Sequence, residues 1–400
     1  MNSYRVSDQE QDQVFTLAQD GFLRDNGNML ESPGCVDWRD FLGRAPREVR
    51  LREIGESNAD KNVLVTGAGG YIGSGLAEAL EKVGVRQLIL LECAEQTLAS
   101  INRRLSALPS HRRHIAILGD VGDLPLLEEI FCTYRPEIIY HTAAFKHLPL
   151  MEFHPLAAVQ NNALATHVLA EAAVRHSARK LILISTDKAV NPTSIMGASK
   201  RIAERIVQEM STTATHMTAV RMGNVLGSPG SVVPIFMDQI GCGGPVTVTA
   251  PQAARYFMTR EDSINAILGA AAHATGPQLL IPDIGPPLPV LELARFLMHR
   301  KGREVPVVFS GLRPGEKLRE EISSNRELIR SCGDCGLNTA EVCDPPAVEI
   351  RPALERIEYL LRRRDTANLL REVLAMVPEY QPSDLVQEIA MRKVRAFAGG

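Results

Sequence analysis

Short apolar runs recur along the middle of the chain, and each leads into a polar or glycine-rich stretch and then a longer amphipathic segment. The runs lie at residues 62–66, 87–91, 115–118, 138–141 and 180–184, and the longer segments at 74–83, 93–108, 124–134, 155–176 and 198–210. Runs of this kind are typical of strands buried in a parallel sheet, and the segments between them are long enough for helices. Their alternation over residues 62–225 predicts a doubly wound α/β sheet.

The first 60 residues are polar by comparison and show little periodicity. Ser7 and Glu10 frame a possible capping box ahead of an apolar cluster, which predicts one short helix. The rest of residues 1–60 is interpreted as an arm or linker.

Composition narrows the class of protein. The 400 residues are 45% hydrophobic with a formal net charge of −3, which is ordinary for a globular chain and offers no basic surface for nucleic acid. No apolar run approaches the ~20 residues needed to span a bilayer, and the first residues lack the apolar core of a signal peptide. We therefore expect a cytoplasmic protein with no membrane span.

The seven cysteines are an odd number, which favours a reducing compartment. Cys332 and Cys335 form a C-x-x-C with Cys343 nearby. A structural zinc site needs four ligands, and no further Cys or His completes this one, so we predict no metal.

The first apolar run leads directly into the glycine-rich turn Gly67-Ala68-Gly69-Gly70-Tyr71-Ile72-Gly73. Between a strand and a helix, such a turn lets the backbone approach a pyrophosphate, which the helix N-terminus then stabilises. The spacing is G-x-x-G-x-x-G, and the context of strand, turn, helix and second strand favours a dinucleotide site. The candidate contacts are Gly67, Gly70, Tyr71, Ile72 and Gly73.

Residues at the ends of the later runs extend this candidate cofactor site. Glu92 ends the second run about 20 residues after the glycines, where a carboxylate binds the adenosine ribose and repels a 2′-phosphate, so NAD is favoured over NADP. The further candidates are Asp120 and Val121 near the adenine, Ala143 and Ala144 where the backbone passes a flat cofactor, and Asn161 on the segment 155–176.

The fifth run ends in Thr186, Asp187 and Lys188, and the helix that follows carries Lys200. In an open parallel sheet the carboxyl edge is where ligands bind. A hydroxyl, an acid and a base side by side at that edge indicate proton-transfer chemistry.

Together these stretches resemble the extended short-chain dehydrogenase/reductase superfamily, and within it the polysaccharide-biosynthesis branch of nucleotide-sugar 4,6-dehydratases acting on UDP-N-acetylglucosamine. The resemblance is carried by residues 63–74, 143–152, 184–200, 221–228, 243–249, 255–259, 311–317 and 377–380, in the expected order. It implies a Rossmann NAD-binding domain over residues 61–245. Over residues 246–400 it implies mainly a smaller substrate-binding lobe with C-terminal helices, from which some strands return to the sheet. It also implies a UDP-sugar substrate and a homo-oligomer.

The superfamily usually has a Tyr-x-x-x-Lys pair, and here Met196 stands at the Tyr position while Lys200 is kept. A thioether cannot transfer a proton, so Thr186, Asp187 and Lys188 are expected to handle the protons instead. Relatives with Met at this position are thought to retain configuration at C5.

The reaction that the resemblance implies oxidises C4, removes the C5 proton, expels the C6 hydroxyl as water and returns the hydride to C6. We expect Lys188 to be the base, with its pKa lowered by burial and by nearby Lys200, and Asp187 to be the acid, with its pKa raised by burial. Thr186 would hydrogen-bond the C4 oxygen, and Lys200 would hold the nicotinamide ribose.

By the same resemblance, the diphosphate and uridine are contacted by Asn224, Arg255, Arg313 and Glu316, and Lys146 is a further candidate contact. Two alternatives stay open. A UDP-sugar epimerase or oxidoreductase would use the same C4 oxidation without dehydration, and a catalytically silent NAD-binding regulator would need no acid or base.

Overall fold

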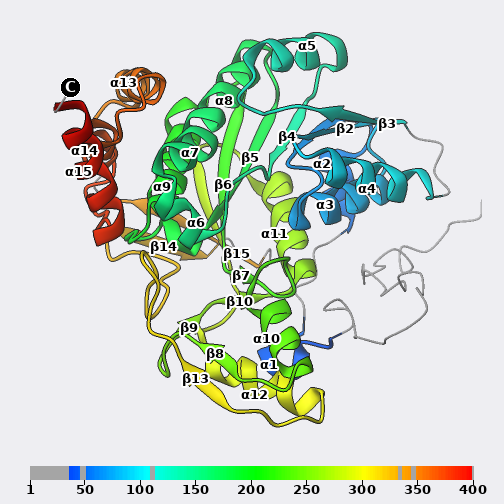
Figure 1. The fold of residues 1–400 in the computed structure, drawn as a ribbon. Helices are drawn as coiled ribbons and strands as arrows, with labels where there is room; N and C mark the ends of the chain where they lie inside the picture. The colour runs from blue at the N-terminus through cyan, green and yellow to red at the C-terminus, as the bar shows by residue number, and fades with distance from the viewer. Residues whose placement is uncertain (1–35, 46–50, 109–112, 332–335, 344–347, 399–400) are drawn as a thin grey trace, which may run out of the picture.

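The computed structural model describes residues 36–45, 51–108, 113–331, 336–343 and 348–398. The helix predicted after Ser7 and the C-x-x-C of Cys332 and Cys335 lie outside the described residues. A twisted sheet with helices on both faces forms the body of the protein, and a smaller lobe lies below it in Figure 1.

Among the described residues, nine strands form the main sheet. They are β1 (Asn62–Thr66), β2 (Gln87–Glu92), β3 (Arg113–Leu118), β4 (Ile138–His141), β5 (Lys180–Thr186), β6 (His216–Met222), β11 (Gln278–Pro282), β14 (Glu327–Ser331) and β15 (Leu337–Val342). The order across the sheet is β14-β15-β11-β6-β5-β4-β1-β2-β3, parallel from β3 to β11 with an antiparallel edge at β15 and β14. The strand order reverses between β1 and β4, as in a doubly wound sheet, so the predicted fold class is confirmed.

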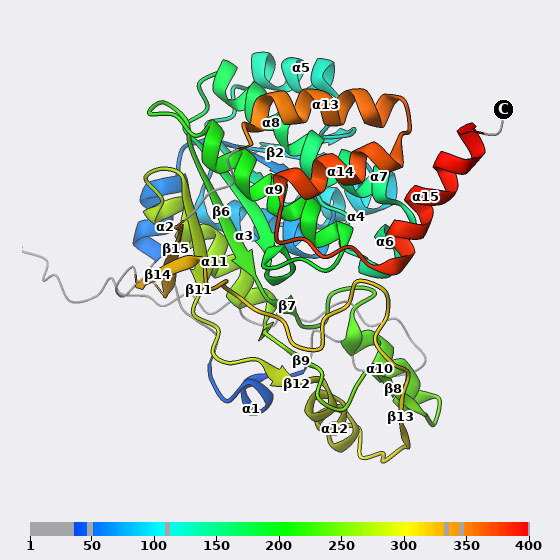
Figure 2. The same cartoon turned by 90° about the vertical axis from the view of Figure 1, so that its left-hand side faces the viewer.

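The helices form a layer on each face of this sheet (Figures 1 and 2). One face is covered by α2 (Leu51–Asn58), α3 (Tyr71–Val83), α4 (Glu95–Ser106) and α11 (Arg260–His273); the other by α5 (Leu124–Tyr134), α6 (Leu148–Phe153), α7 (Pro155–Val159), α8 (Ala165–Arg175) and α9 (Ile195–Met210). Along β1, Val63 and Val65 pack in the core between the sheet and the first of these helix layers, and Leu64 packs in the core between the sheet and the second layer. Burial on both faces explains why such strands read as continuous apolar runs.

The segment predicted as one helix over residues 155–176 contains a π-helical turn, η2 (Gln160–Leu164), between α7 and α8. The Thr166 hydroxyl donates to the carbonyl oxygen of Asn162 at 2.8 Å, a side-chain contact of the kind that bends helices. Single π turns are frequent at functional sites, and this one carries Asn161 and Asn162.

A separate hydrophobic cluster holds the lobe together. It joins α10 (Val232–Gly241), α12 (Val290–Arg300), β8 (Val246–Val248) and β13 (Val307–Phe309) around Phe257. α10 packs in the lobe, whereas β11 returns to the sheet and α11 packs on it. The division at residue 245 stays a prediction.

Residues 36–44, which include α1 (Arg39–Leu42), pack onto this lobe, and we call them the N-terminal clasp. The ring of Phe41 lies 5.6 Å from that of Phe257 and 5.5 Å from that of Phe296. The Arg44 guanidinium pairs bidentately with the Asp262 carboxylate, at 3.0 Å for each bond, at the start of α11. The clasp, predicted as part of a linker, therefore ties the lobe to a helix of the sheet.

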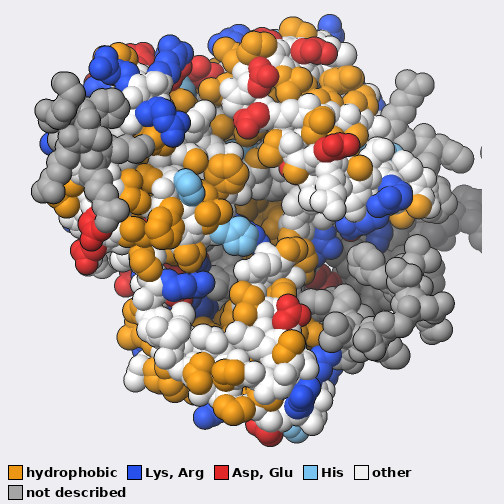
Figure 3. Space-filling model, in the orientation of Figure 1, with side chains coloured by type: hydrophobic (Ala, Val, Ile, Leu, Met, Phe, Trp, Pro, Cys, Tyr) orange, Lys and Arg blue, Asp and Glu red, His pale blue; other side chains and the backbone are white. Residues whose placement is uncertain are grey.

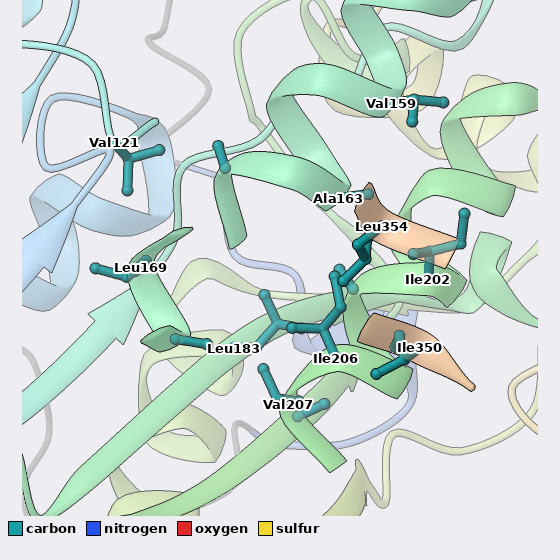
Figure 4. Packing of buried hydrophobic residues seen from close by; sticks show 14 of the residues in the cluster. Val121, Val159, Ala163, Leu169, Leu183, Ile202, Ile206, Val207, Ile350 and Leu354 are labelled. Carbon is teal, nitrogen blue, oxygen red and sulfur yellow. The ribbon is translucent and has the colours of Figure 1, made fainter. Parts of the chain in front are cut away.

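The C-terminal helices α13 (Ile350–Arg362), α14 (Thr366–Met376) and α15 (Asp384–Ala398) complete the fold. In Figure 4, Ile350 and Leu354 of α13 lie beside Ile202 and Ile206 of α9, within one continuous core. Figure 2 shows α13 and α14 over the helices of that face. The helix that follows the predicted catalytic stretch is therefore buried on both sides.

Candidate active site

The carboxyl ends of the parallel strands meet at the edge of the sheet that faces the lobe (Figure 1). β5 ends at Thr186, and a 3-10 turn, η3 (Asp187–Ala189), leads the chain away from the sheet. α9 begins after Ser194, whose hydroxyl oxygen accepts a hydrogen bond from the amide of Gly197 at 3.1 Å. This turn and cap fix the predicted catalytic residues at the sheet edge.

Asp187 and Lys188 form a buried ion pair. Asp187 is fully buried, and the Lys188 Nζ donates to its Oδ1 at 2.9 Å and to the Oδ1 of Asn224 at 2.7 Å. The Thr186 hydroxyl donates to the same Asp187 oxygen at 2.9 Å. Asp187 Oδ2 is buried without a hydrogen-bond donor among the described residues, so one carboxylate oxygen keeps its hydrogen-bonding capacity unused.

Burial raises the pKa of Asp187, against the opposing effect of the Lys188 ammonium, in the direction that was predicted. Burial also disfavours the charge on Lys188, but the carboxylates of Asp187 and Glu320 outweigh it and hold the pKa of Lys188 above its ordinary range. The expectation that burial and Lys200 lower the pKa of Lys188 is therefore wrong. Its immediate neighbours are two carboxylates, so Lys188 is held as an ammonium.

Lys200 lies two turns inside α9 and is only 4% exposed. Burial lowers its pKa to about 8, although Glu204 opposes the shift, and within the described ranges no group accepts a hydrogen bond from its Nζ. His141, at the end of β4, contacts the hydroxyls of Thr66 and Thr166, and burial together with Lys200 lowers its pKa to about 3. A neutral histidine and an unpaired amine thus lie side by side under the sheet edge.

Met196 occupies the position where the superfamily has Tyr and is 4% exposed, packed in the core beneath α9. Its thioether can neither donate nor accept the proton of a sugar hydroxyl. The titratable side chains of η3, Asp187 and Lys188, therefore stay the predicted proton-transfer groups at this edge.

The glycine-rich turn forms a cradle that side chains would fill. Gly67 has φ +66°, and a Cβ added to it would lie 2.7 Å from the backbone of Ala143. A Cβ on Gly73 would lie 2.2 Å from the Gly67 carbonyl oxygen. α3 begins after Gly70 without a side-chain cap, so its first amides are available to an anion. This cradle fits a dinucleotide pyrophosphate.

The acids predicted to contact the adenosine lie beside this cradle. Glu92 Oε2 accepts from the Gly69 amide at 2.9 Å, and its Oε1 accepts from the Ala94 amide at 3.1 Å, which fixes an acceptor-only carboxylate next to the turn. Asp120 Oδ1 accepts from the Gly122 amide at 2.7 Å. Val121 is 5% exposed and packs in the core, so only its backbone is available to a ligand.

The remaining predicted cofactor contacts are mostly tied to other parts of the protein. The Tyr71 hydroxyl donates to the carbonyl oxygen of Leu226 at 3.1 Å, and the Arg260 guanidinium stacks on the Tyr71 ring at 4.8 Å. Ile72 packs partly against the core of the α3 face. Ala144 is exposed on the loop after β4.

Asn161 donates through its Nδ2 to the side chain of Asn162 at 2.9 Å. Asn162 in turn bonds both the amide and the carbonyl of Phe145, at 2.8 and 3.0 Å, and the Ser199 hydroxyl at 3.1 Å. The π turn therefore anchors the loop after β4 to α9. The apolar pattern of the segment carried no signal for Asn162.

The predicted substrate residues converge on Glu316. Its Oε1 accepts from Arg255 at 2.8 Å, and its Oε2 accepts from the Arg313 Nε at 3.2 Å. Arg255, in β9 (Ala254–Arg255), is 5% exposed and also donates to the carbonyl oxygens of Ala254 and Leu318. Its donors are thus used inside the protein, whereas Arg313 is exposed.

Asn224, in β7 (Asn224–Val225), pairs with β10 (Phe257–Met258) and serves as a hydrogen-bond acceptor for Lys188. Lys146 is exposed, and its Nζ donates to the carbonyl oxygen of Pro229 at 2.9 Å. The surface is recessed between the body and the lobe, and Lys and Arg side chains are visible along this recess in Figure 3.

One group of three potential metal ligands occurs among the described residues: Glu128 and Cys132 on α5, and His176 after α8. Both Glu128 oxygens are already bonded, one to Arg175 and one to His176. This group lies near the amino end of β5, away from the candidate site, and we assign no metal to it.

A family model described as Polysaccharide biosynthesis protein matches residues 63–333. The capsular polysaccharide biosynthesis protein CapD of Staphylococcus aureus is 42% identical over 299 residues, which are 73% of this chain and 50% of the relative. The chain thus spans about half the length of that curated relative. Among the described helices, none has the length and apolar character to cross a membrane.

Two solved structures show the same fold. Pen from Bacillus thuringiensis superposes with a TM-score of 0.65 at 24% identity, over 76% of this chain and 98% of that one. DesIV, a dTDP-glucose 4,6-dehydratase from Streptomyces venezuelae with NAD and TYD bound, gives a TM-score of 0.57 at 21% identity, with the same coverage of both chains.

Proposed function

The chain belongs to the Polysaccharide biosynthesis protein family, and on this premise we propose that it is an NAD-dependent nucleotide-sugar 4,6-dehydratase acting on UDP-N-acetylglucosamine. The observation that carries the proposal is the ion pair of the fully buried Asp187 with Lys188, at the same carboxyl edge of the sheet as the glycine-rich turn. A reaction that removes one proton and delivers another needs two such groups within reach of one sugar ring.

The cradle at Gly67 and the carboxylate of Glu92 would hold the adenosine diphosphate half of NAD, and the NAD bound to DesIV, which shares this fold, supports that choice. The chemistry that NAD supplies when bound is reversible hydride transfer with the sugar. Lys200 would hold the nicotinamide ribose, because its amine lies under the sheet edge without an acceptor among the described residues.

The two proton transfers can be assigned to the pair with the protons balanced. Lys188 becomes a base when its proton passes to Asp187 across the 2.9 Å hydrogen bond, which leaves a neutral amine and a neutral carboxylic acid. Once C4 is a ketone, the C5 proton is acidic and the amine takes it. The Asp187 acid protonates the C6 hydroxyl, which leaves as water. Lys188 is then an ammonium and Asp187 a carboxylate. Return of the hydride to C6 also requires a proton at C5, which the Lys188 ammonium would supply. The amine left behind would take up one proton from solvent, which balances the proton that the C4 hydroxyl releases when C4 is oxidised, and the pair returns to its starting form.

Burial raises the pKa of Asp187, which prepares its carboxylate to accept the proton, whereas the neighbouring carboxylates raise the pKa of Lys188 and favour its ammonium form. The ion pair would therefore be the resting form, and the neutral pair would form only during the reaction. Thr186 would hydrogen-bond the C4 oxygen, from its place next to Asp187. Asn224 would orient Lys188 through the 2.7 Å bond. This assignment keeps Lys188 as base and Asp187 as acid, without requiring a low pKa for an isolated lysine.

The nucleotide would lie over the loop that carries Arg313. Its guanidinium is exposed and suits a diphosphate, whereas the buried Arg255 organises the loop through Glu316. Lys146 lies on the loop after β4 and would contact the sugar. The uridine would then be held on the lobe and the sugar at the sheet edge.

The test is incubation of the protein and NAD with UDP-N-acetylglucosamine, followed by mass spectrometry. Loss of one water without accumulation of NADH is expected, and a Lys188→Met variant serves as the control that should leave the substrate intact. Unchanged mass with altered NMR couplings would instead identify an epimerase. No change with several UDP-sugars would favour a silent NAD-binding protein.

A further inference from the structure

Glu320 is a buried carboxylate at the candidate site that the sequence did not single out. It follows the Arg313 loop, in a segment whose backbone runs beside β9, where the Glu320 amide donates to the Ala254 carbonyl oxygen at 3.4 Å. Its side chain is 1% exposed. In the sequence, Lys317-Leu318-Arg319-Glu320-Glu321 resembles an ordinary solvated run of charges.

Three cations surround this carboxylate at distances longer than good hydrogen bonds. Glu320 Oε1 lies 3.5 Å from the Lys188 Nζ and 3.9 Å from the Arg255 Nε, and its Oε2 lies 3.9 Å from the Lys317 Nζ. Oε2 is buried and accepts no hydrogen bond from any residue that the structure describes. The carboxylate is held by charge and not by fitted donors.

Glu204 shows what a purely structural carboxylate looks like in the same protein. It is fully buried, and it accepts from Ser185 at 2.6 Å, from Arg201 at 2.9 Å, and from Arg221 through two bonds at 3.1 and 2.9 Å. Every oxygen of Glu204 is satisfied. The Glu320 carboxylate is also buried but lacks such hydrogen bonds within the described part of the chain, so a structural role alone does not explain it.

We propose that Glu320 is a positioning residue that keeps Lys188 protonated until substrate is bound, and that links the protonation of Lys188 to the cations of the substrate loop. This inference rests on the proposed function. Two carboxylates face Lys188: Asp187 from its own turn and Glu320 from the segment beside β9. Two cations also lie close to it, Arg255 from β9 and Lys317 from the same segment as Glu320. Two carboxylates therefore share one ammonium, and only one of them is a proton donor in the reaction.

Removing the charge of Glu320 should make Lys188 a better base at lower pH. An opposite charge at this distance typically moves a pKa by roughly 1–3 units. The isosteric change Glu320→Gln should therefore lower the titration midpoint of Lys188 by at least about one unit. If Lys188 must be neutral to act, the rising limb of the rate profile should move to lower pH by the same amount.

The titration can be followed without turnover, by NMR of cofactor-free protein carrying ¹³C-labelled lysine. The Lys188 signal is identified by its absence from Lys188→Met. In the wild type this signal should stay in its charged form at the pH where an ordinary lysine titrates, and in Glu320→Gln its midpoint should move to lower pH than in the wild type. Glu321→Gln is the matched control, because the exposed Glu321 accepts from Asn191 and should leave the Lys188 signal unchanged.

An unchanged Lys188 midpoint in Glu320→Gln would overturn the proposal, whatever the enzyme converts. A lowered midpoint in a protein that converts no UDP-sugar would support the role of Glu320 and refute the proposed function. Glu320→Asp keeps the charge and should restore a high midpoint, which separates the effect of charge from that of packing. If Glu320→Gln does not fold, Glu320→Asp carries the test. Its shorter side chain places the carboxylate farther from Lys188 and should lower the midpoint slightly below that of the wild type, and an identical midpoint would count against the proposal.

Discussion

Replacing Lys200 by Met should stabilise the cofactor-free protein at neutral pH while abolishing tight NAD binding. Lys200 is 4% exposed, and burial lowers its pKa to about 8 from the 10.5 of a free lysine. Met has a similar length and no charge, so it fits the same space without the cost of a buried ammonium. Lys200, which is proposed to hold the nicotinamide ribose, is therefore expected to lower the stability of the folded protein.

The size of the effect follows from the two pKa values. The difference between 10.5 and about 8 is about 2.5 pKa units, and at ~1.4 kcal/mol per unit the cost is about 3 kcal/mol. Below pH 8 the amine is protonated in both the folded and the unfolded chain, so the full cost applies at pH 7. Above pH 10.5 it is neutral in both states, and the cost vanishes. Through this group the wild type gains stability as the pH rises from about 8 to 10.5.

Urea unfolding of the cofactor-free proteins at pH 7 and pH 10 measures the difference. Lys200→Met should be more stable than the wild type by about 2–3 kcal/mol at pH 7 and by less than about 1 kcal/mol at pH 10. Lys82→Met, on the exposed face of α3, is the control and should change little at either pH. A Lys200→Met protein that is less stable than the wild type at pH 7 would refute the reasoning, because the ammonium would then be stabilised in the fold.

Three further predictions concern the ligands and the proton pair. Because the Glu92 carboxylate would repel a 2′-phosphate, titration of cofactor-free protein should show tighter binding of NAD than of NADP, and the reverse order would exclude that role. Arg313→Ala should lose a charge-assisted contact that contributes ~1.5–3 kcal/mol to substrate binding. Calorimetry should therefore show an affinity for the UDP-sugar that is about 10- to 100-fold lower, with the affinity for NAD unchanged. Unchanged UDP binding would mean that the substrate site is misplaced. Lys188→Met should fold and bind NAD but lose C5 exchange in heavy water and water loss by ~10²–10⁴-fold. Asp187→Asn can no longer take up the Lys188 proton, so it should also lose both at neutral pH. Normal dehydration by Lys188→Met would point to another base.

The central parallel strands and the fold class were predictable because burial on both faces leaves a local signal in the sequence. Residues 138–141 and 124–134 were predicted with the bounds that the structure has. The latter helix is preceded by Asp123, whose side chain accepts from the Leu126 amide, and has Pro125 in its first turn. Such starts depend on neighbouring residues only.

The properties that were not predicted depend on contacts between distant residues. The high pKa of Lys188 comes partly from Glu320, which reaches it from another part of the chain. The π turn at Asn162 is stabilised by its bonds to Phe145 and Ser199, which apolar periodicity does not report. The position of the candidate catalytic turn was thus predictable from the sequence, whereas the protonation state of its Lys188 was not.

The N-terminal clasp decides where the chain can be shortened. A fragment starting at β1 would retain the whole stretch matched by the family model, yet it would uncover the rings of Phe257 and Phe296 and leave Asp262 without Arg44. A newly exposed aromatic patch promotes aggregation. A shortened fragment for expression should therefore start no later than Val36. Poor solubility of a fragment that starts later would reflect the exposed aromatic rings and not a defect in the sheet.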